Sequence, residues 1–152
     1  FAMGSFLFYE GKVRDGVRHG NFGVCQYSDG RKYEGQWKNN ERHGLGVQTW
    51  PQGGNGLGGM QRRDEGQWQN GRMHGHCVQY ELGPNNREKT KYEGEFRNGR
   101  KHGRGVFTDI HGREHREHWN DGMRDDFKTK LTDVLVTYGE RFFLWCAENV
   151  DM

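Results

Sequence analysis

A repeated pattern of about fourteen residues constrains the fold of this chain more than any other feature. Most copies open with an aromatic residue, an acidic residue and glycine, and continue through a second aromatic residue and a turn to a His-Gly pair. The copies are YEGKVRDGVRHGNFG from Tyr9, YEGQWKNNERHGLG from Tyr33, DEGQWQNGRMHGHC from Asp64 and YEGEFRNGRKHGRG from Tyr92, with a weaker fifth, HREHWNDGMRDD, from His115. Such self-similarity predicts an array of small units, each packed against its neighbours.

The spacing of the copies gives the length of the unit. Their leading glycines, and the glutamate that replaces the last one, are separated by 24, 31, 28 and 23 residues, at Gly11, Gly35, Gly66, Gly94 and Glu117. The basic unit is therefore 23 or 24 residues long, and two copies carry insertions. The insertions, Pro51–Arg63 and Leu82–Lys91, lie between units, and we predict that they are flexible connections.

Each copy predicts a β-hairpin. In a strand, alternate residues share a face, so Tyr33, Gly35 and Trp37 lie on one side and the polar residues between them on the other. The turns are predicted at Asn-Gly or Asp-Gly pairs, with Asn39-Asn40 in the second copy. Because glycine has no side chain, rings from the same and the next hairpin can lie over bare backbone.

Two copies depart from the pattern. The first has one extra residue at Asn21-Phe22, and the third has Cys77 in place of its second glycine. Both changes predict a bulge or a shifted register.

The pattern resembles that of the MORN-repeat family, over residues 9–122. The resemblance implies a mainly β fold, an elongated single-layer antiparallel sheet of stacked hairpins. We divide the chain into residues 1–5, which resemble an expression-tag remnant, an array of about five hairpins over 6–122, and a C-terminal segment over 123–152.

In the C-terminal segment apolar residues recur at steps of three and four, and this spacing predicts an α-helix. Its expected anchors are Phe127, Leu131, Leu135, Tyr138, Phe142 and Trp145. The apolar side of such a helix is stable only when it is buried against another surface. We predict that the helix caps the last repeats of its own chain, and a homodimer formed through this helix is the alternative.

The sequence contains no catalytic motif, so we expect no enzymatic activity and no cofactor. The repeated histidines His19, His43, His74 and His102 would lie too far apart on successive hairpins to share a metal ion. The denser stretch HGREHREH from His111 lacks a fourth fixed ligand. We therefore expect no metal site.

Two functional classes remain. The first is a scaffold that binds a protein partner, an apolar helix or peptide, in an aromatic groove with a glycine floor. Its predicted lining is Tyr33, Trp37, Trp50, Trp68, Tyr92, Phe96 and Trp119. The alternative is peripheral membrane or phosphoinositide binding through basic residues, a role associated with the resembled family. The basic residues in question are Arg62, Arg63, Arg97, Arg100, Lys101 and Arg104.

The net charge and the cysteine content limit which ligands and which cellular compartment are expected. The net charge of +2 does not indicate nucleic-acid binding. Cys25, Cys77 and Cys146 are odd in number and have no CxxC spacing, which favours a reducing, cytoplasmic compartment. The family resemblance further implies cytoskeletal, ciliary or membrane-junction assemblies.

Overall fold

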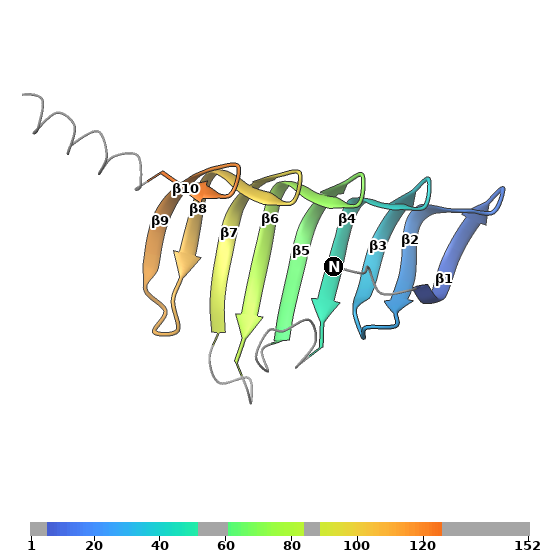
Figure 1. Ribbon diagram of the computed structural model, residues 1–152, viewed down its shortest axis with the longest axis horizontal. Coiled ribbons are helices and arrows are strands. Elements are labelled where there is room, and N and C mark those ends of the chain that lie inside the picture. The colour runs from blue at the N-terminus through green and yellow to red at the C-terminus, as the bar shows by residue number, and fades with distance from the viewer. Residues whose placement is uncertain (1–5, 52–60, 84–88, 126–152) are drawn as a thin grey trace, which may run out of the picture.

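The computed structural model describes residues 6–51, 61–83 and 89–125, which form one open antiparallel sheet of ten strands in chain order (Figure 1). The strands are β1 Phe6–Arg14, β2 Val17–Tyr27, β3 Lys32–Lys38, β4 Glu41–Trp50, β5 Gln61–Gln69, β6 Arg72–Leu82, β7 Lys89–Arg97, β8 Arg100–Thr108, β9 Glu114–Asn120 and β10 Met123–Arg124. Each strand pairs with the next along the chain, so every repeat is a hairpin. This confirms the expected mainly β, single antiparallel sheet.

The tight turns lie where the sequence predicts them. Both residues of each turn have positive φ, for example 50° at Asn70 and 75° at Gly71. The others are Asp15-Gly16, Asn39-Asn40, Asn98-Gly99 and Asp121-Gly122. Positive φ at both central residues is the geometry of a two-residue hairpin turn, which Asn, Asp and Gly tolerate. The five turns lie side by side in a row at one end of the strands (Figure 1).

A row of mostly small residues, which ends at Glu117, crosses the sheet at right angles to the strands, and we call it the glycine row. Register pairing places these residues opposite one another on nine successive strands, in the order Gly11, Gly23, Gly35, Gly46, Gly66, Cys77, Gly94, Gly105 and Glu117. The Tyr33 ring lies on this row, because a Cβ added at Gly46 would be only 2.2 Å from the Tyr33 hydroxyl oxygen. The glycines therefore make room for the rings, as predicted.

The hairpins share a bulge beside the glycine row. In the second hairpin Gly35 pairs with Gly46 and Trp37 with Arg42, so β4 carries two more residues than β3 between these pairs. Gly44 lies in this bulge with φ of 57°. The Gln36 side chain accepts a hydrogen bond from the Leu45 N–H at 2.9 Å and holds the bulge in place.

Both predicted register changes lie beside register shifts, but only the first shift is particular to its repeat. A register shift between Gly20 and Gly23 accommodates the extra residue of the first repeat. The shift beside Cys77, between Gly66 and Trp68, is the bulge that the first four hairpins share. Cys77 pairs with Gly94 without any further shift between β6 and β7.

The predicted flexible connections need a similar correction at their ends. Gln61–Arg63 belong to β5 and Lys89–Lys91 to β7, because both segments pair with β6. Most of the remaining insertion residues lie outside the described part of the chain.

The sheet ends at β10, whose residues Met123 and Arg124 pair with Asn120 and Trp119. These two residues, assigned from the sequence to the C-terminal segment, complete the fifth hairpin. The predicted helix and its anchors from Phe127 to Trp145 lie outside the described residues. Over the three described ranges, no helix has the length and apolar character needed to cross a membrane.

Candidate functional site

The aromatic residues of the repeats gather on one side of the sheet, which we call the aromatic face. Tyr33 packs edge-on between Trp37 and Trp68, with ring centroids 5.1 and 5.4 Å apart. Tyr9 extends this stack, 5.4 Å from Trp37. Edge-to-face packing is a favourable arrangement of rings and stabilises each pair by about 0.5–1.5 kcal/mol beyond area burial. One hairpin is thus joined to the next through its rings.

A second stack lies nearer the C-terminus. Tyr92 packs edge-on against Phe96 at 5.6 Å and Trp119 at 6.1 Å. Burial raises the pKa of the Tyr92 hydroxyl to about 12, and the nearby Glu117 and Glu95 carboxylates act in the same direction. Tyr92 is therefore a neutral core residue at physiological pH.

All seven predicted groove residues lie on the aromatic face, but most of them are buried. Five rings have relative exposures of 0 to 5%, those of Tyr33, Trp37, Trp68, Tyr92 and Phe96. Trp50 and Trp119 are partly buried. The indole N–H groups of Trp37 and Trp68 donate to the carbonyl oxygens of Gly23 and Gly46 at 3.2 and 3.0 Å. These rings fill the floor of the aromatic face as a core, so a partner would meet what lies above them.

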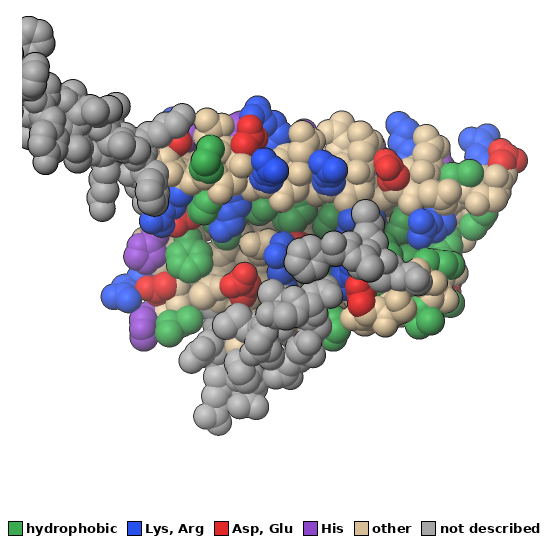
Figure 2. All heavy atoms as spheres, viewed as in Figure 1, with side chains coloured by type: hydrophobic (Ala, Val, Ile, Leu, Met, Phe, Trp, Pro, Cys, Tyr) green, Lys and Arg blue, Asp and Glu red, His purple; other side chains and the backbone are tan. Residues whose placement is uncertain are grey.

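Basic side chains lie over the rings, and we call Arg18, Arg42 and Lys101 the basic cover. The Arg18 guanidinium carbon is 4.5 Å from the Trp37 ring centroid and that of Arg42 is 4.6 Å from Trp68. The Lys101 ammonium is 3.8 Å from the Tyr92 ring centroid. These are cation–π distances. Figure 2 shows Lys and Arg side chains beside the hydrophobic band that runs along the molecule.

The basic cover also joins neighbouring repeats. Arg18 donates to the carbonyl oxygen of Asn40 in the next turn at 3.0 Å. Arg42 donates in the same way to Gly71 and also to the buried Gln48 side chain. Burial lowers the pKa of Arg42 and of Lys101, because it disfavours the charged form.

Sequence reasoning named Lys101 only as a possible lipid contact and did not identify Arg18 or Arg42. The members of the basic cover occupy the position just before the repeated histidine, where the third repeat has Met73. The recurrence of Arg, Arg and Lys at that position was the signal that could have identified them. Met73 is itself buried, with 4% exposure, and belongs to the same core cluster as the rings.

A polar cluster interrupts the aromatic face at the third repeat. Asp64 occupies the position of the repeat tyrosine and is fully buried. Arg62 donates to both of its carboxylate oxygens, at 2.9 and 2.7 Å, and Gln79 donates to one of them at 3.1 Å. This fixed pair separates the N-terminal ring stack from the C-terminal one.

The six basic residues predicted as lipid contacts do not form one patch. Two lie on the aromatic face, two on the reverse face and two at the turn between β7 and β8: Arg62 and Lys101, Arg63 and Arg104, Arg97 and Arg100, respectively. Three of them form ion pairs with neighbouring carboxylates at N–O distances of 2.6 or 2.7 Å. Their charge is therefore dispersed and partly neutralised.

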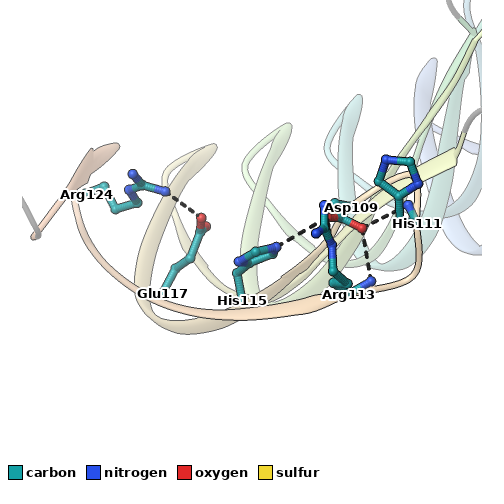
Figure 3. A network of polar contacts seen from close by, with 6 residues as sticks. All are labelled: Asp109, His111, Arg113, His115, Glu117 and Arg124. Atoms are coloured by element: carbon teal, nitrogen blue, oxygen red, sulfur yellow. Dashed lines mark hydrogen bonds and ion pairs between the residues drawn. The ribbon is translucent and has the colours of Figure 1, made fainter.

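The histidine-rich stretch forms polar contacts around Asp109 (Figure 3). This carboxylate accepts hydrogen bonds from the backbone N–H groups of Arg113 and His111 at 3.0 and 2.9 Å, and His115 lies 3.5 Å away. The hydrogen bond from the Arg113 backbone is the main cause of a lowered pKa of Asp109. In the described ranges, no three His, Cys, Asp or Glu side chains converge as metal ligands would.

The reverse face is shallow and mixed in charge. One hollow on it, of about 710 Å³, is lined among others by Glu93, Glu95, Arg104 and Arg116. Acidic and basic side chains both line this hollow, and the described residues of its lining include no Tyr, Trp or Phe.

Comparison with protein families agrees with the repeat boundaries. A family model described as "MORN repeat" matches residues 9–30, 33–55, 65–80 and 92–109. These segments correspond to the hairpins β1–β2, β3–β4, β5–β6 and β7–β8. The β9–β10 hairpin lies beyond the matched segments.

Proposed function

Because this chain belongs to the MORN-repeat family, we propose that it is a non-catalytic scaffold that binds a protein partner along the aromatic face. MORN repeats are known in protein–protein and membrane-binding contexts, and the family is generally non-catalytic. The observation that carries the proposal is the basic cover, which lies directly over buried rings and is supplied by the first, second and fourth repeats. A surface that is apolar below and cationic above can bind one class of segment at several points.

The chemistry of this face favours an apolar helix or peptide that also carries acidic side chains. Trp50 and Trp119, which are only partly buried, offer apolar contact at two places along the array. Carboxylates of the partner would approach Arg18, Arg42 and Lys101, where partial burial strengthens charge interactions. The predicted groove thus remains the binding face, with the basic cover added to its contact residues.

The cellular setting is part of the proposal. Cys25 and Cys77 are both free and buried, which suits a reducing, cytoplasmic compartment. A long rigid sheet suits an assembly in which a partner is held at several points, such as a cytoskeletal, ciliary or membrane-junction complex.

The test is affinity capture with face-matched variants, followed by identification of the bound proteins. Replacing Trp37 or Trp68 would damage the core, so the variants alter the cover instead. The aromatic-face variant is Arg42→Gln with Lys101→Gln, and the control on the reverse face is Glu34→Gln with Glu93→Gln. We expect the first to lose most of the captured partner and the second to retain it, while both keep the wild-type circular dichroism spectrum. Equal retention by both variants would contradict the proposal.

The membrane-binding alternative is tested with the same proteins. Sedimentation with phosphatidylserine vesicles at physiological salt is expected to leave the chain in the supernatant, because the basic residues are dispersed over two faces and a turn. Pelleting that falls with rising salt and is lost in the Arg42→Gln, Lys101→Gln variant would support the membrane alternative instead of the protein partner.

A further inference from the structure

The strand β1 forms an open edge of the sheet (Figure 1). Within the part of the chain that the structure describes, no strand pairs with its outer side. Four of its apolar residues are exposed, Phe8 by 49%, Val13 by 53%, Phe6 by 55% and Leu7 by 66%. An exposed edge strand that carries apolar side chains is a template for pairing with another strand.

The glycine row also ends at this edge. Gly11 is exposed, whereas the next two members of the row, Gly23 and Gly35, are buried between strands. At every inner position, a small residue of the row meets another residue of the row on the adjacent strand. Gly11 has such a neighbour on one side only.

From these features we infer that β1 pairs with β1 of a second copy of this chain, antiparallel and centred on Gly11. The regular part of the strand supports this register. Leu7 is an extra residue relative to β2, whereas the second register shift, between Gly11 and Val13, adds residues to β2 and none to β1. The strand β1 itself therefore runs without an extra residue over Phe8–Arg14, and the midpoint of this segment is Gly11. A twofold axis there joins the two glycine rows and keeps both aromatic faces on the same side of the combined sheet.

Charge complementarity favours a second copy over an unrelated strand. With Gly11 opposite its own symmetry mate, Glu10 lies opposite Lys12 of the other copy, and the same pair recurs by symmetry. Tyr9 lies opposite Val13, which extends the apolar side of the pair. Opposite charges directly across two strands stabilise pairing, and like charges disfavour it.

This contact is distinct from the homodimer expected through the C-terminal helix. It uses only described residues of the first strand and leaves Arg42 and Lys101 free for the proposed partner. The partner-capture experiment and the experiment below can therefore fail independently.

The test measures the mass of the full chain by light scattering over a dilution series, with charge reversals at the two predicted cross-pairs. The wild type is expected to approach twice its 17.8 kDa mass at high concentration. Glu10→Lys alone and Lys12→Glu alone each place like charges opposite one another twice, and should weaken the dimer by about tenfold or more. Both side chains are exposed, so the fold should be unaffected.

Two further samples test the register itself. The Glu10→Lys, Lys12→Glu double variant and an equimolar mixture of the two single variants should both recover the dimer, because opposite charges face each other again. A monomer at all concentrations would overturn the inference. So would a dimer that the single reversals leave unchanged, which would indicate another surface, or a mass that grows beyond two chains, which would indicate head-to-tail stacking.

Discussion

Replacing Gly46 by alanine tests the role of the glycine row in supporting the rings. The three heavy atoms nearest to an added Cβ all belong to Tyr33, at 2.2, 2.5 and 2.7 Å. The Tyr33 ring is fully buried between Trp37 and Trp68, so it cannot move away without disturbing both ring contacts. Gly46 has no positive φ, so backbone strain adds nothing to the effect.

The expected cost follows from these contacts. Overpacking a core costs about 1–3 kcal/mol, and weakening one ring pair adds about 0.5–1.5 kcal/mol. We therefore expect Gly46→Ala to lower the free energy of unfolding by roughly 3 kcal/mol. For a chain of this length that corresponds to a fall in Tm of roughly 6–12 °C.

The assay is urea unfolding followed by tryptophan fluorescence, arranged as a double-mutant cycle with Tyr33→Leu. Leucine lacks the ring atoms that the added methyl group would meet, so Gly46→Ala should cost less than about 1 kcal/mol in that background. Gly16→Ala measures the cost of backbone strain without a steric contact, because Gly16 has φ of 74° and no atom lies within 4 Å of its added Cβ. Equal costs of Gly46→Ala in both backgrounds would refute the idea that the row exists to seat the ring.

Three other predictions rest on the same structure. Arg42→Ala removes the cation over Trp68 and the hydrogen bond to the next turn, and should lower the free energy of unfolding by about 1–3 kcal/mol. Arg42→Met, which copies Met73 of the third repeat, should lower it less, and thermal melts compare the two variants. Asp64→Asn leaves the Arg62 guanidinium without its carboxylate and should cost about 2 kcal/mol by urea unfolding, less than a fully buried pair because Arg62 is partly exposed. Burial raises the pKa of Tyr92 to about 12, so the neutral hydroxyl contributes stability that is complete below about pH 10 and is lost as the pH rises towards 12. Tyr92→Phe should remove this part of the loss of stability at alkaline pH. At about pH 11, absorbance at 295 nm should show fewer ionised tyrosines in the folded chain than in the unfolded chain.

The hairpins and their faces were predictable because their signals are local. Alternation within Tyr33–Trp37 assigns the rings to one side, and an Asn-Gly pair fixes a turn without reference to the rest of the fold. The glycine row also follows from sequence, since each of the first four repeats places a glycine at the same distance before its turn.

The cover and the interruption of the rings depend on contacts between repeats, so local patterns did not show them. Arg42 lies over Trp68 of the next hairpin, and the burial of Asp64 depends on Arg62 and on Gln79 of the adjacent strand. An acidic residue in a strand is ordinarily exposed. The predicted open groove was likewise filled by its own rings, because the packing of Tyr33 between two tryptophans is a property of stacked hairpins and not of one repeat.

The most direct test of this packing is fluorine NMR of the full chain labelled with 5-fluorotryptophan, with each of the five tryptophans assigned by its own Trp→Phe variant. Exposure to solvent shifts a fluorine resonance when water is replaced by deuterium oxide. Trp37 and Trp68, which are 3% and 5% exposed, should show no such shift, since their rings are enclosed by Tyr33, the glycine row and the basic cover. A shift at both positions as large as that of the free amino acid would mean that the rings line an open groove, and the arrangement described here would be wrong.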